Sequence, residues 1–305
     1  MITIFTPTYN RAELLFKLYS SLKNQTQKDF EWVIVDDGST DNTRTIVSQF
    51  LEEDNDFSIR YFVQENHGKH VAVNLGVEKA LGEYFFIVDS DDWLPENAVE
   101  KINNMFVDIK NKSNFAGVAG LKMYSSGDIV GKTFEGAFVD CTNLERANNN
   151  ILGDKAEVYY TSVLRKYPFP VFEGENFLSE EVVWNRIARD GNRLRWYNEG
   201  LYYCEYLEGG LSKTSNKEYK NFNGFKLVTK EYVTYKQISY KNKIIRLMIL
   251  GDIAIRKKEK ISKVAKEISV NALVLYVLAY IGFAARKIKH MGKKKHEGQR
   301  NYPSL

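Results

Sequence analysis

The first third of the chain alternates between short apolar runs and longer stretches in which apolar residues recur every three or four positions. The apolar runs lie at 2–6, 30–35, 59–63 and 85–88, and the helically spaced stretches lie at 11–25, 41–51 and 71–80. Strands that alternate with helices in this way predict an α/β fold whose central sheet is mostly parallel and flanked by helices. Further strand-like runs at 114–123 and 159–164 enclose a polar stretch, 125–154, with little periodicity.

A different pattern begins near residue 216. Helical spacing mixed with lysines runs to about residue 266, and an apolar stretch of 18 residues then covers 268–285. Basic residues follow at Arg286, Lys287, Lys289, Lys293, Lys294 and Lys295. We therefore predict two parts, 1–215 and 216–305, of which the second is a helical, basic, C-terminal extension.

The apolar stretch 268–285 has two interpretations. Eighteen residues lie at the short end of what a membrane-spanning helix needs, and a basic cluster beside an apolar helix favours peripheral contact with an anionic membrane. A helix packed on the rest of the protein, or one that binds a partner, is the alternative.

Charged residues are also distributed unevenly along the chain. The net charge is +4, but from Lys241 onwards 16 Lys and Arg face 4 Asp and Glu, so the first 240 residues are acidic. An acidic body with a basic tail is not the profile of a nucleic-acid-binding surface, and we predict no nucleic-acid partner. The N-terminus lacks the features of an export signal, and Cys141 and Cys204 lie far apart in the sequence. Both observations predict a cytoplasmic protein with reduced thiols.

The stretch Phe85–Trp93 runs from four apolar residues into Asp89, Asp91 and Asp92 around Ser90. Ligands of open α/β sheets bind where parallel strands end at their carboxyl edge. Carboxylates clustered there repel one another unless a cation lies among them, and such oxygen ligands suit Mg²⁺ or Mn²⁺ holding a diphosphate. The alternative is a helix N-cap, although capping accounts for only one of the three carboxylates.

Other predicted strands end at the same edge in side chains that suit a nucleotide. Thr6, Thr8 and Tyr9 could flank a base, Asp37 could accept from a base N–H or a ribose hydroxyl, and Lys69 could meet a phosphate. Each signal is weak alone, and their recurrence at one edge strengthens them. The sequence contains neither Gly-x-Gly-x-x-Gly nor a Walker loop, which argues against a dinucleotide dehydrogenase or a P-loop enzyme.

Four ordered motifs resemble those of the family 2 glycosyltransferases, which have the Rossmann-like GT-A fold. They are Thr6-Pro7-Thr8-Tyr9-Asn10-Arg11, Val35-Asp36-Asp37-Gly38-Ser39-Thr40-Asp41, Asn66-His67-Gly68 with Asn74, and Asp89-Ser90-Asp91-Asp92. The resemblance is close over roughly the first hundred residues and continues to about Thr214. It implies a nucleotide-sugar site formed by Thr6, Pro7, Thr8, Tyr9, Asp37, Asn66, Lys69, Asp89, Ser90 and Asp91.

The resemblance also implies roles within that site. Asp91 would bind the metal, Mn²⁺ or Mg²⁺, with Asp89 beside it near the ribose, and Asp37 would read the base, typically uracil. This chain departs from many relatives in having Val73 where they have an arginine just before Asn74.

Glu180 and Glu181 stand at the start of a predicted helix. By themselves they would interact favourably with the helix dipole. Inverting members of the family usually have Glu-Asp here, with the second acid as general base, so the resemblance implies Glu181 as the base and leaves Glu180 as the other candidate. The acceptor hydroxyl must lose its proton while it attacks the anomeric carbon, and one direct displacement inverts that centre. We expect Gly209–Lys213 to close over the diphosphate or simply to connect two elements.

Taken together, the resemblance implies an inverting, metal-dependent, hexosyltransferase-type glycosyltransferase with residues 1–215 as its GT-A domain. The donor would be a nucleotide-sugar, typically a UDP-sugar, and the acceptor a glycan or lipid-linked saccharide in cell-surface polysaccharide synthesis. We expect it to work at the inner face of the cell membrane, and a homo-oligomer is compatible with the sequence. The alternatives are a catalytically silent GT-A module that partners an active transferase and a nucleotidyltransferase.

Overall fold

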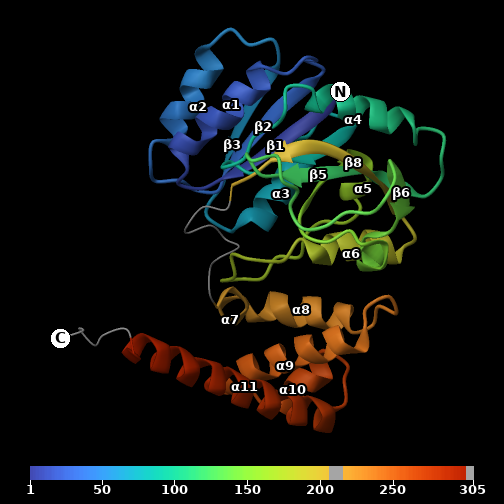
Figure 1. Cartoon of the computed structure of the whole chain (residues 1–305). Coiled ribbons are helices and arrows are strands. Elements are labelled where there is room, and N and C mark those ends of the chain that lie inside the picture. The colour runs from blue at the N-terminus through green and yellow to red at the C-terminus, as the bar shows by residue number, and fades with distance from the viewer. Residues whose placement is uncertain (206–215, 300–305) are drawn as a thin grey trace. The chain divides into compact units, whose positions relative to one another are not determined.

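The computed structural model describes residues 1–205 and 216–299, with side chains as far as residue 288. The chain divides into two compact units, Met1–Ser215 and Asn216–Leu305, and Figure 1 labels most of their helices and strands. The predicted loop at Gly209–Lys213 lies outside the described residues, as do the side chains of Lys289 and Lys293–Lys295 in the predicted basic cluster.

An eight-stranded sheet forms the centre of the first unit (Figure 1), with the strand order β3-β2-β1-β4-β7-β5-β8-β6. The strands are β1 (Ile2–Thr8), β2 (Phe30–Asp36), β3 (Ser58–Val63), β4 (Tyr84–Ile87), β5 (Phe115–Met123), β6 (Phe138–Cys141), β7 (Lys155–Tyr160) and β8 (Arg193–Tyr203). The helices are α1 (Leu15–Lys23), α2 (Thr43–Glu52), α3 (Lys69–Lys79), α4 (Ala98–Val107), α5 (Thr161–Leu164) and α6 (Glu181–Arg189), with 3₁₀ helices η1 (Ala12–Leu14) and η2 (Asn143–Asn149).

The first four strands form the parallel half of the sheet. β1 pairs in parallel with β2 and β4, so that Ile4 lies opposite both Trp32 and Phe86, and β2 pairs in parallel with β3. Helices α1, α2 and α3 connect these strands in the order that the alternating pattern predicted, which confirms the α/β class. The carboxyl ends of β1, β2 and β4 consequently meet at one edge, where ligands of such sheets bind.

The second half of the sheet is mixed. β7 runs antiparallel to β4 and β5, β8 runs parallel to β5, and β6 runs antiparallel to β8. Four of the seven strand pairings in the sheet are therefore parallel, and the three antiparallel ones involve β6 and β7. The run predicted as a strand at 159–164 divides in two, since β7 ends at Tyr160 and the helical turn α5 begins at Thr161. A short apolar run does not distinguish a strand from a buried helical turn, which accounts for the difference.

Aromatic side chains fill the first unit on both sides of the sheet. Trp32 and Phe50 are nearly or fully buried with α1 and α4 residues in one cluster. Elsewhere Tyr159 stacks on Trp184 of α6 with 4.5 Å between ring centroids, and the indole N–H of Trp196 donates to the Cys141 carbonyl at 3.0 Å. The two tryptophans at 184 and 196 are thus core residues.

The second unit is helical, as predicted for the C-terminal extension. Its helices are α7 (Lys217–Lys220), α8 (Phe222–Tyr232), α9 (Tyr240–Arg256), α10 (Ile261–Glu267) and α11 (Ala272–Gln299). Leu250, Ile253, Val264 and Leu275 are buried together in its core. Within the described residues no single helix has the length and apolar composition to cross a membrane, although Ile261–Glu267 and Ala272–Ile288 meet both criteria as a pair bent by 118°.

Candidate active site

Lys69 joins two acidic segments that are distant in the sequence. It is the first residue of α3, and its ammonium lies 2.6 Å from the Asp89 carboxylate and 2.9 Å from the Glu180 carboxylate. Asp89 follows β4, whereas Glu180 precedes α6. Lys69, Asp89 and Glu180, each a candidate from the sequence alone, therefore lie together at the carboxyl edge of the parallel strands.

The charges of this cluster stabilise one another. Burial alone would lower the pKa of Lys69, but the carboxylates of Asp89 and Glu180 raise it above its ordinary value. Burial likewise would raise the pKa of Asp89, and the positive charges of Lys69 and Lys122 reverse that effect and lower it. At neutral pH Lys69 is therefore a cation and Asp89 an anion.

Asp91 has its own cationic partner in Arg11. The Arg11 guanidinium donates to the Asp91 carboxylate at 2.5 Å, and the two side chains are 26% and 19% exposed. Arg11 belongs to the first of the four motifs, but sequence reasoning did not place it in the site. An arginine after the first strand is a usable signal only when the strand order is known, because that order brings β1 beside β4.

Asp92 is held inside the protein and does not cap a helix. Its carboxylate accepts from the Tyr202 hydroxyl at 2.7 Å, and that hydroxyl accepts from the backbone N–H of Asp89 at 2.9 Å. Burial, and then the charge of Asp89, raise the pKa of Asp92 to about 7. The N-cap of α4 is Asn97, so capping does not explain the acidic cluster. Ser90 is also buried.

Lys122 is a second cation at these acids, and sequence reasoning missed it. It lies on β5 with its ammonium 4.0 Å from the ring centroid of Tyr202. Burial would lower the pKa of Lys122, but the charges of Asp89 and Asp92 raise it. The available signal was one lysine inside an otherwise apolar strand, which is costly to bury without a partner.

Asp37 organises the loop that precedes α3. It is buried, and its carboxylate accepts from the Gln64 amide at 2.7 Å and from the backbone N–H groups of His67 and Gly68 at 2.9 and 2.7 Å. These three hydrogen bonds use several of the positions at which the carboxylate can accept. Asp37 therefore holds the loop before α3 in place at the edge of the site. Asn66, in the same loop, is exposed.

The residues at the end of β1 differ in what they present to solvent. Thr6 and Pro7 are buried, and the Thr6 hydroxyl accepts from the indole N–H of Trp32 at 2.9 Å. Thr8 is buried with a hydroxyl that has no hydrogen-bond partner among the described residues. Tyr9 is 46% exposed. Of this group Tyr9 therefore offers the most surface to a ligand, while Thr6 faces the interior.

Glu180 and Glu181 both lie at the start of α6, Glu180 as its N-cap residue and Glu181 as its first residue. Both positions allow the favourable interaction with the helix dipole that the sequence suggested. The Glu180 carboxylate forms the ion pair with Lys69.

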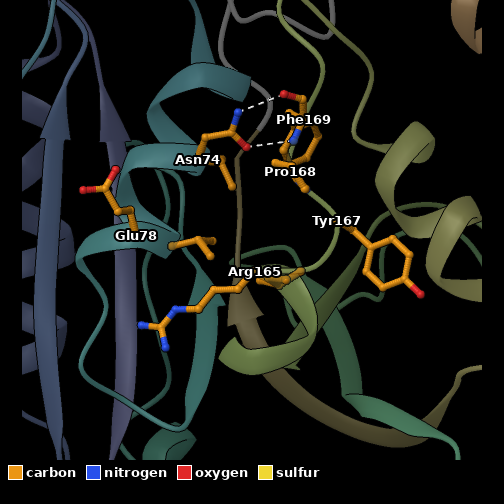
Figure 2. A pocket seen from close by; sticks show the side chains of 9 residues that line it. Asn74, Glu78, Arg165, Tyr167, Pro168 and Phe169 are labelled. Atoms are coloured by element: carbon orange, nitrogen blue, oxygen red, sulfur yellow. Dashed lines mark hydrogen bonds between the residues drawn. The ribbon is translucent and has the colours of Figure 1, made fainter.

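Two contacts hold the segment before α6 against α3. The Asn74 side-chain amide donates to the Phe169 carbonyl at 2.9 Å and its oxygen accepts from the Phe169 N–H at 2.8 Å, as Figure 2 shows. At Gly68, which has a φ of +92°, an added Cβ would lie 1.8 Å from the Asn176 carbonyl oxygen. Asn74 and Gly68, which both belong to the third motif, thus contact the segment that leads to Glu180.

A cavity of about 260 Å³ lies beside the Asn74 contact. Val73, Val77, Leu164 and Arg165 help to line it, and Figure 2 labels Arg165 and Glu78 among the lining side chains. Asp89, Asp91 and Glu180 are not among its lining residues. The cavity is therefore separate from the acidic cluster.

The acids at the end of β4 suit a metal only in part. Among the described residues no group of three or more His, Cys, Asp or Glu side chains is arranged to hold an ion. Asp89 and Asp91 supply two carboxylates, the oxygen ligands that Mg²⁺ and Mn²⁺ prefer, and such ions commonly complete their shell with substrate phosphates and water. The two acids fit a metal that arrives with a diphosphate.

Comparison with known proteins identifies the family. The family model for glycosyl transferase family 2 matches residues 3–130. TuaG of Bacillus subtilis (strain 168), named for teichuronic acid biosynthesis, is 32% identical over 78% of this chain and 88% of its own length. The chain belongs to glycosyltransferase family 2.

Two further similarities agree with this identification. A GalNAc(5)-diNAcBac-PP-undecaprenol beta-1,3-glucosyltransferase of Campylobacter jejuni is 27% identical over 72% of this chain and 78% of its own length. Crystalline S. aureus TarS 1–349 in complex with UDP-GlcNAc has a TM-score of 0.63 at 21% identity and covers 84% of this chain and 72% of its own. The second similarity concerns the fold alone, and it confirms the GT-A expectation for this glycosyltransferase.

Proposed function

We propose that this family 2 glycosyltransferase transfers a hexosyl residue from a UDP-sugar, with inversion, to a saccharide or lipid-linked saccharide acceptor. The observation that carries the proposal is the bridge from Asp89 through Lys69 to Glu180. It brings the acids expected to bind the donor within one side chain of the acids expected to take the acceptor proton. The undecaprenol in the name of the Campylobacter relative supports a lipid-linked acceptor, and the UDP-GlcNAc complex of TarS supports a UDP-sugar donor.

Four charged side chains near the strand ends take part in donor binding in this proposal. Asp89 and Asp91 would hold Mn²⁺ or Mg²⁺, which when bound offsets charge on the leaving diphosphate. Lys69 and Lys122 place two more positive charges beside Asp89, where they would stabilise the same developing charge. Tyr9, which is 46% exposed, is available to the base.

A carboxylate at the start of α6 accepts the proton of the attacking hydroxyl in this proposal. The family resemblance favours Glu181, and the contact with Lys69 favours Glu180. The Glu180 carboxylate is held by the Lys69 ammonium at 2.9 Å, so Glu180 would reach an acceptor hydroxyl after Lys69 turns towards the diphosphate. Glutamine substitutions separate the two acids.

The proposal extends to the organisation of the chain. Residues 1–215 would carry out the reaction, and residues 216–305 would keep the protein at the inner face of the cell membrane, where lipid-linked saccharides are extended in cell-surface polysaccharide synthesis. The basic character of the second part supports this placement, because anionic lipids attract Lys and Arg near a membrane surface.

Release of nucleoside diphosphate tests the reaction. The full chain is incubated with UDP-, GDP- and dTDP-sugars, Mn²⁺ and candidate acceptors, and UDP release is expected. Asp91→Ala should abolish metal-dependent donor binding in calorimetry. Of Glu181→Gln and Glu180→Gln, the variant that lacks the base should bind UDP normally and release none from the sugar donor. Full turnover by both glutamine variants would refute a base at the start of α6.

A catalytically silent module is the second candidate. The observation in its favour is that Asp89 and Asp91 are each paired with a cation of the chain itself, Lys69 and Arg11. Such a module would bind UDP in calorimetry and release no nucleoside diphosphate from any donor, with or without acceptor.

A further inference from the structure

The long C-terminal helix α11 is apolar on two opposite sides. On the inner side Leu275 and Ala279 are fully buried in the core of the second unit. On the other side six large side chains are between 48% and 72% exposed. These six, which we call the outer face of α11, are Leu273, Val274, Tyr276, Val277, Tyr280 and Ile281.

The outer face is continuous. At 3.6 residues per turn its six residues fall within an arc of about 160°, and Leu275 and Ala279 lie on the opposite side of the helix. Small residues bring α9 close on that inner side, since an added Cβ at Gly251 would lie 2.5 Å from the Ala279 Cβ, and one at Gly282 would lie 2.4 Å from the Met248 carbonyl oxygen. A helix that is apolar all round is normally covered on every side by protein or by lipid.

The charge of the second unit indicates which of these covers the outer face. Residues 216–305 contain 21 Lys and Arg against 6 Asp and Glu. Depletion of charge is usual in the core of a protein–protein interface, whereas an apolar helix face within a strongly basic segment is typical of binding to anionic lipid.

The structure also shows which basic side chains are available to lipid. Arg286 is turned inwards and donates to the buried Asp252 carboxylate at 2.9 and 3.0 Å. It therefore stabilises the helical unit and does not belong to the basic cluster that faces a membrane. Lys287 is exposed, with its ammonium 4.6 Å from the Phe283 ring centroid. A lysine there can keep its charge at the headgroups while its stem covers apolar surface.

Two tyrosines of the outer face fit the same environment. Tyr276 and Tyr280 lie one turn apart with ring centroids separated by 4.8 Å, and each is 50% exposed. Tyrosine has an apolar ring and a polar hydroxyl, and it concentrates where hydrocarbon meets water.

We propose that the outer face of α11 inserts into the headgroup region of an anionic lipid bilayer, with the helix parallel to the surface. The 118° bend between α10 and α11 suits a helix that lies in the interface, about 5–10 Å deep. This inference deepens the proposed function by naming the surface that would hold the enzyme beside a lipid-linked acceptor, and for that consequence it rests on the proposed function.

Vesicle flotation of the full chain tests the proposal. The wild type should float with vesicles of phosphatidylglycerol and phosphatidylcholine and remain largely at the bottom with phosphatidylcholine alone. Leu273→Glu/Val277→Glu places two carboxylates on the outer face and should lower the vesicle partition coefficient at least about tenfold, because two aliphatic side chains no longer enter the bilayer. The matched control is Leu81→Glu/Val107→Glu, which makes the same charge change at residues 68% and 70% exposed in the first unit, and it should float like the wild type.

Three results would overturn the proposal. The first is a wild type that does not float with anionic vesicles, and the second is an α11 variant that floats as well as its control. The third is a wild type that binds no vesicles and forms a dimer, which Leu273→Glu/Val277→Glu converts to a monomer. In that case a second copy of the chain would cover the outer face. Circular dichroism and thermal unfolding verify that the variants are folded. Nucleoside diphosphate release in vesicle-free buffer is measured in parallel, so that loss of activity and loss of lipid binding are recorded separately.

Discussion

Replacing Lys69 with methionine should weaken both the fold and the donor site. The substitution removes an ammonium that lies 2.6 Å from Asp89 and 2.9 Å from Glu180, with the three side chains 26%, 31% and 36% exposed. Breaking a fully buried pair costs roughly 3–5 kcal/mol and breaking an exposed one about 0–1 kcal/mol. For these partly exposed pairs we expect the free energy of unfolding to fall by about 1–3 kcal/mol.

The effect on donor binding is a separate quantity. If Lys69 contacts the diphosphate, its loss removes a hydrogen bond to a charged group, which is worth about 1.5–3 kcal/mol. The dissociation constant of UDP with Mn²⁺ should then rise roughly 10- to 150-fold. Urea unfolding measures the first quantity, and titration calorimetry measures the second.

Lys79→Met is the matched control. Lys79 is the last residue of the same helix, its side chain is 36% exposed, and it pairs with the adjacent Glu78 at 2.8 Å. The control loses the same charge at the other end of α3 and should change neither quantity by more than about 0.5 kcal/mol. If Lys69→Met lost stability but bound UDP like the wild type, Lys69 would be a structural link only, and its proposed contact with the diphosphate would be wrong.

Three other substitutions test how the site is supported. Asn74→Ala removes two hydrogen bonds to the Phe169 backbone and should cost about 2–3 kcal/mol in urea unfolding, with Asn74→Asp, which keeps only the acceptor, in between. Gly68→Ala should cost more than about 2 kcal/mol or prevent folding, whereas Gly127→Ala, at a φ of +88° with nothing within 4 Å of the added Cβ, shows the backbone strain alone; equal losses would contradict the steric argument. Burial lowers the pKa of Lys155 to about 8, below about 10.4 for an unfolded lysine, so the unfolded state binds more protons between these values and stability should rise by about 3 kcal/mol as the pH increases through that window. Lys155→Met should abolish that rise, and an unchanged pH slope in its urea unfolding would refute the assignment.

The sequence predicted the parallel half of the fold well because its signals are local. The apolar run 30–35 and the leucines at 15, 18 and 22 depend only on the periodicity of a strand and of a helix. The structure places β2 at Phe30–Asp36 and buries those three leucines, all of which lie in α1. Strand ends followed by polar residues then locate a common edge without any knowledge of distances.

The second half was less predictable because its strands pair out of sequence order. β7 lies between β4 and β5, and β5 pairs with β8 although β6, β7, α5 and α6 separate them in the sequence. Nothing in a local pattern specifies that Tyr202 of β8 will donate to Asp92 after β4. Lys122 was missed for the same reason, since its acidic neighbours come from another strand.

The sequence by itself determined the α/β class, the helical basic extension and the identity of the acids at the edge of the sheet, because each follows from residue type and local spacing. Only the tertiary structure decided how these acids are paired. It brought Lys69 between Asp89 and Glu180, turned Arg11 to Asp91, and directed Arg286 inwards to Asp252. Ion pairs between distant segments depend on strand order and helix packing, which are set by burial of the whole apolar surface and not by the neighbours of any one residue.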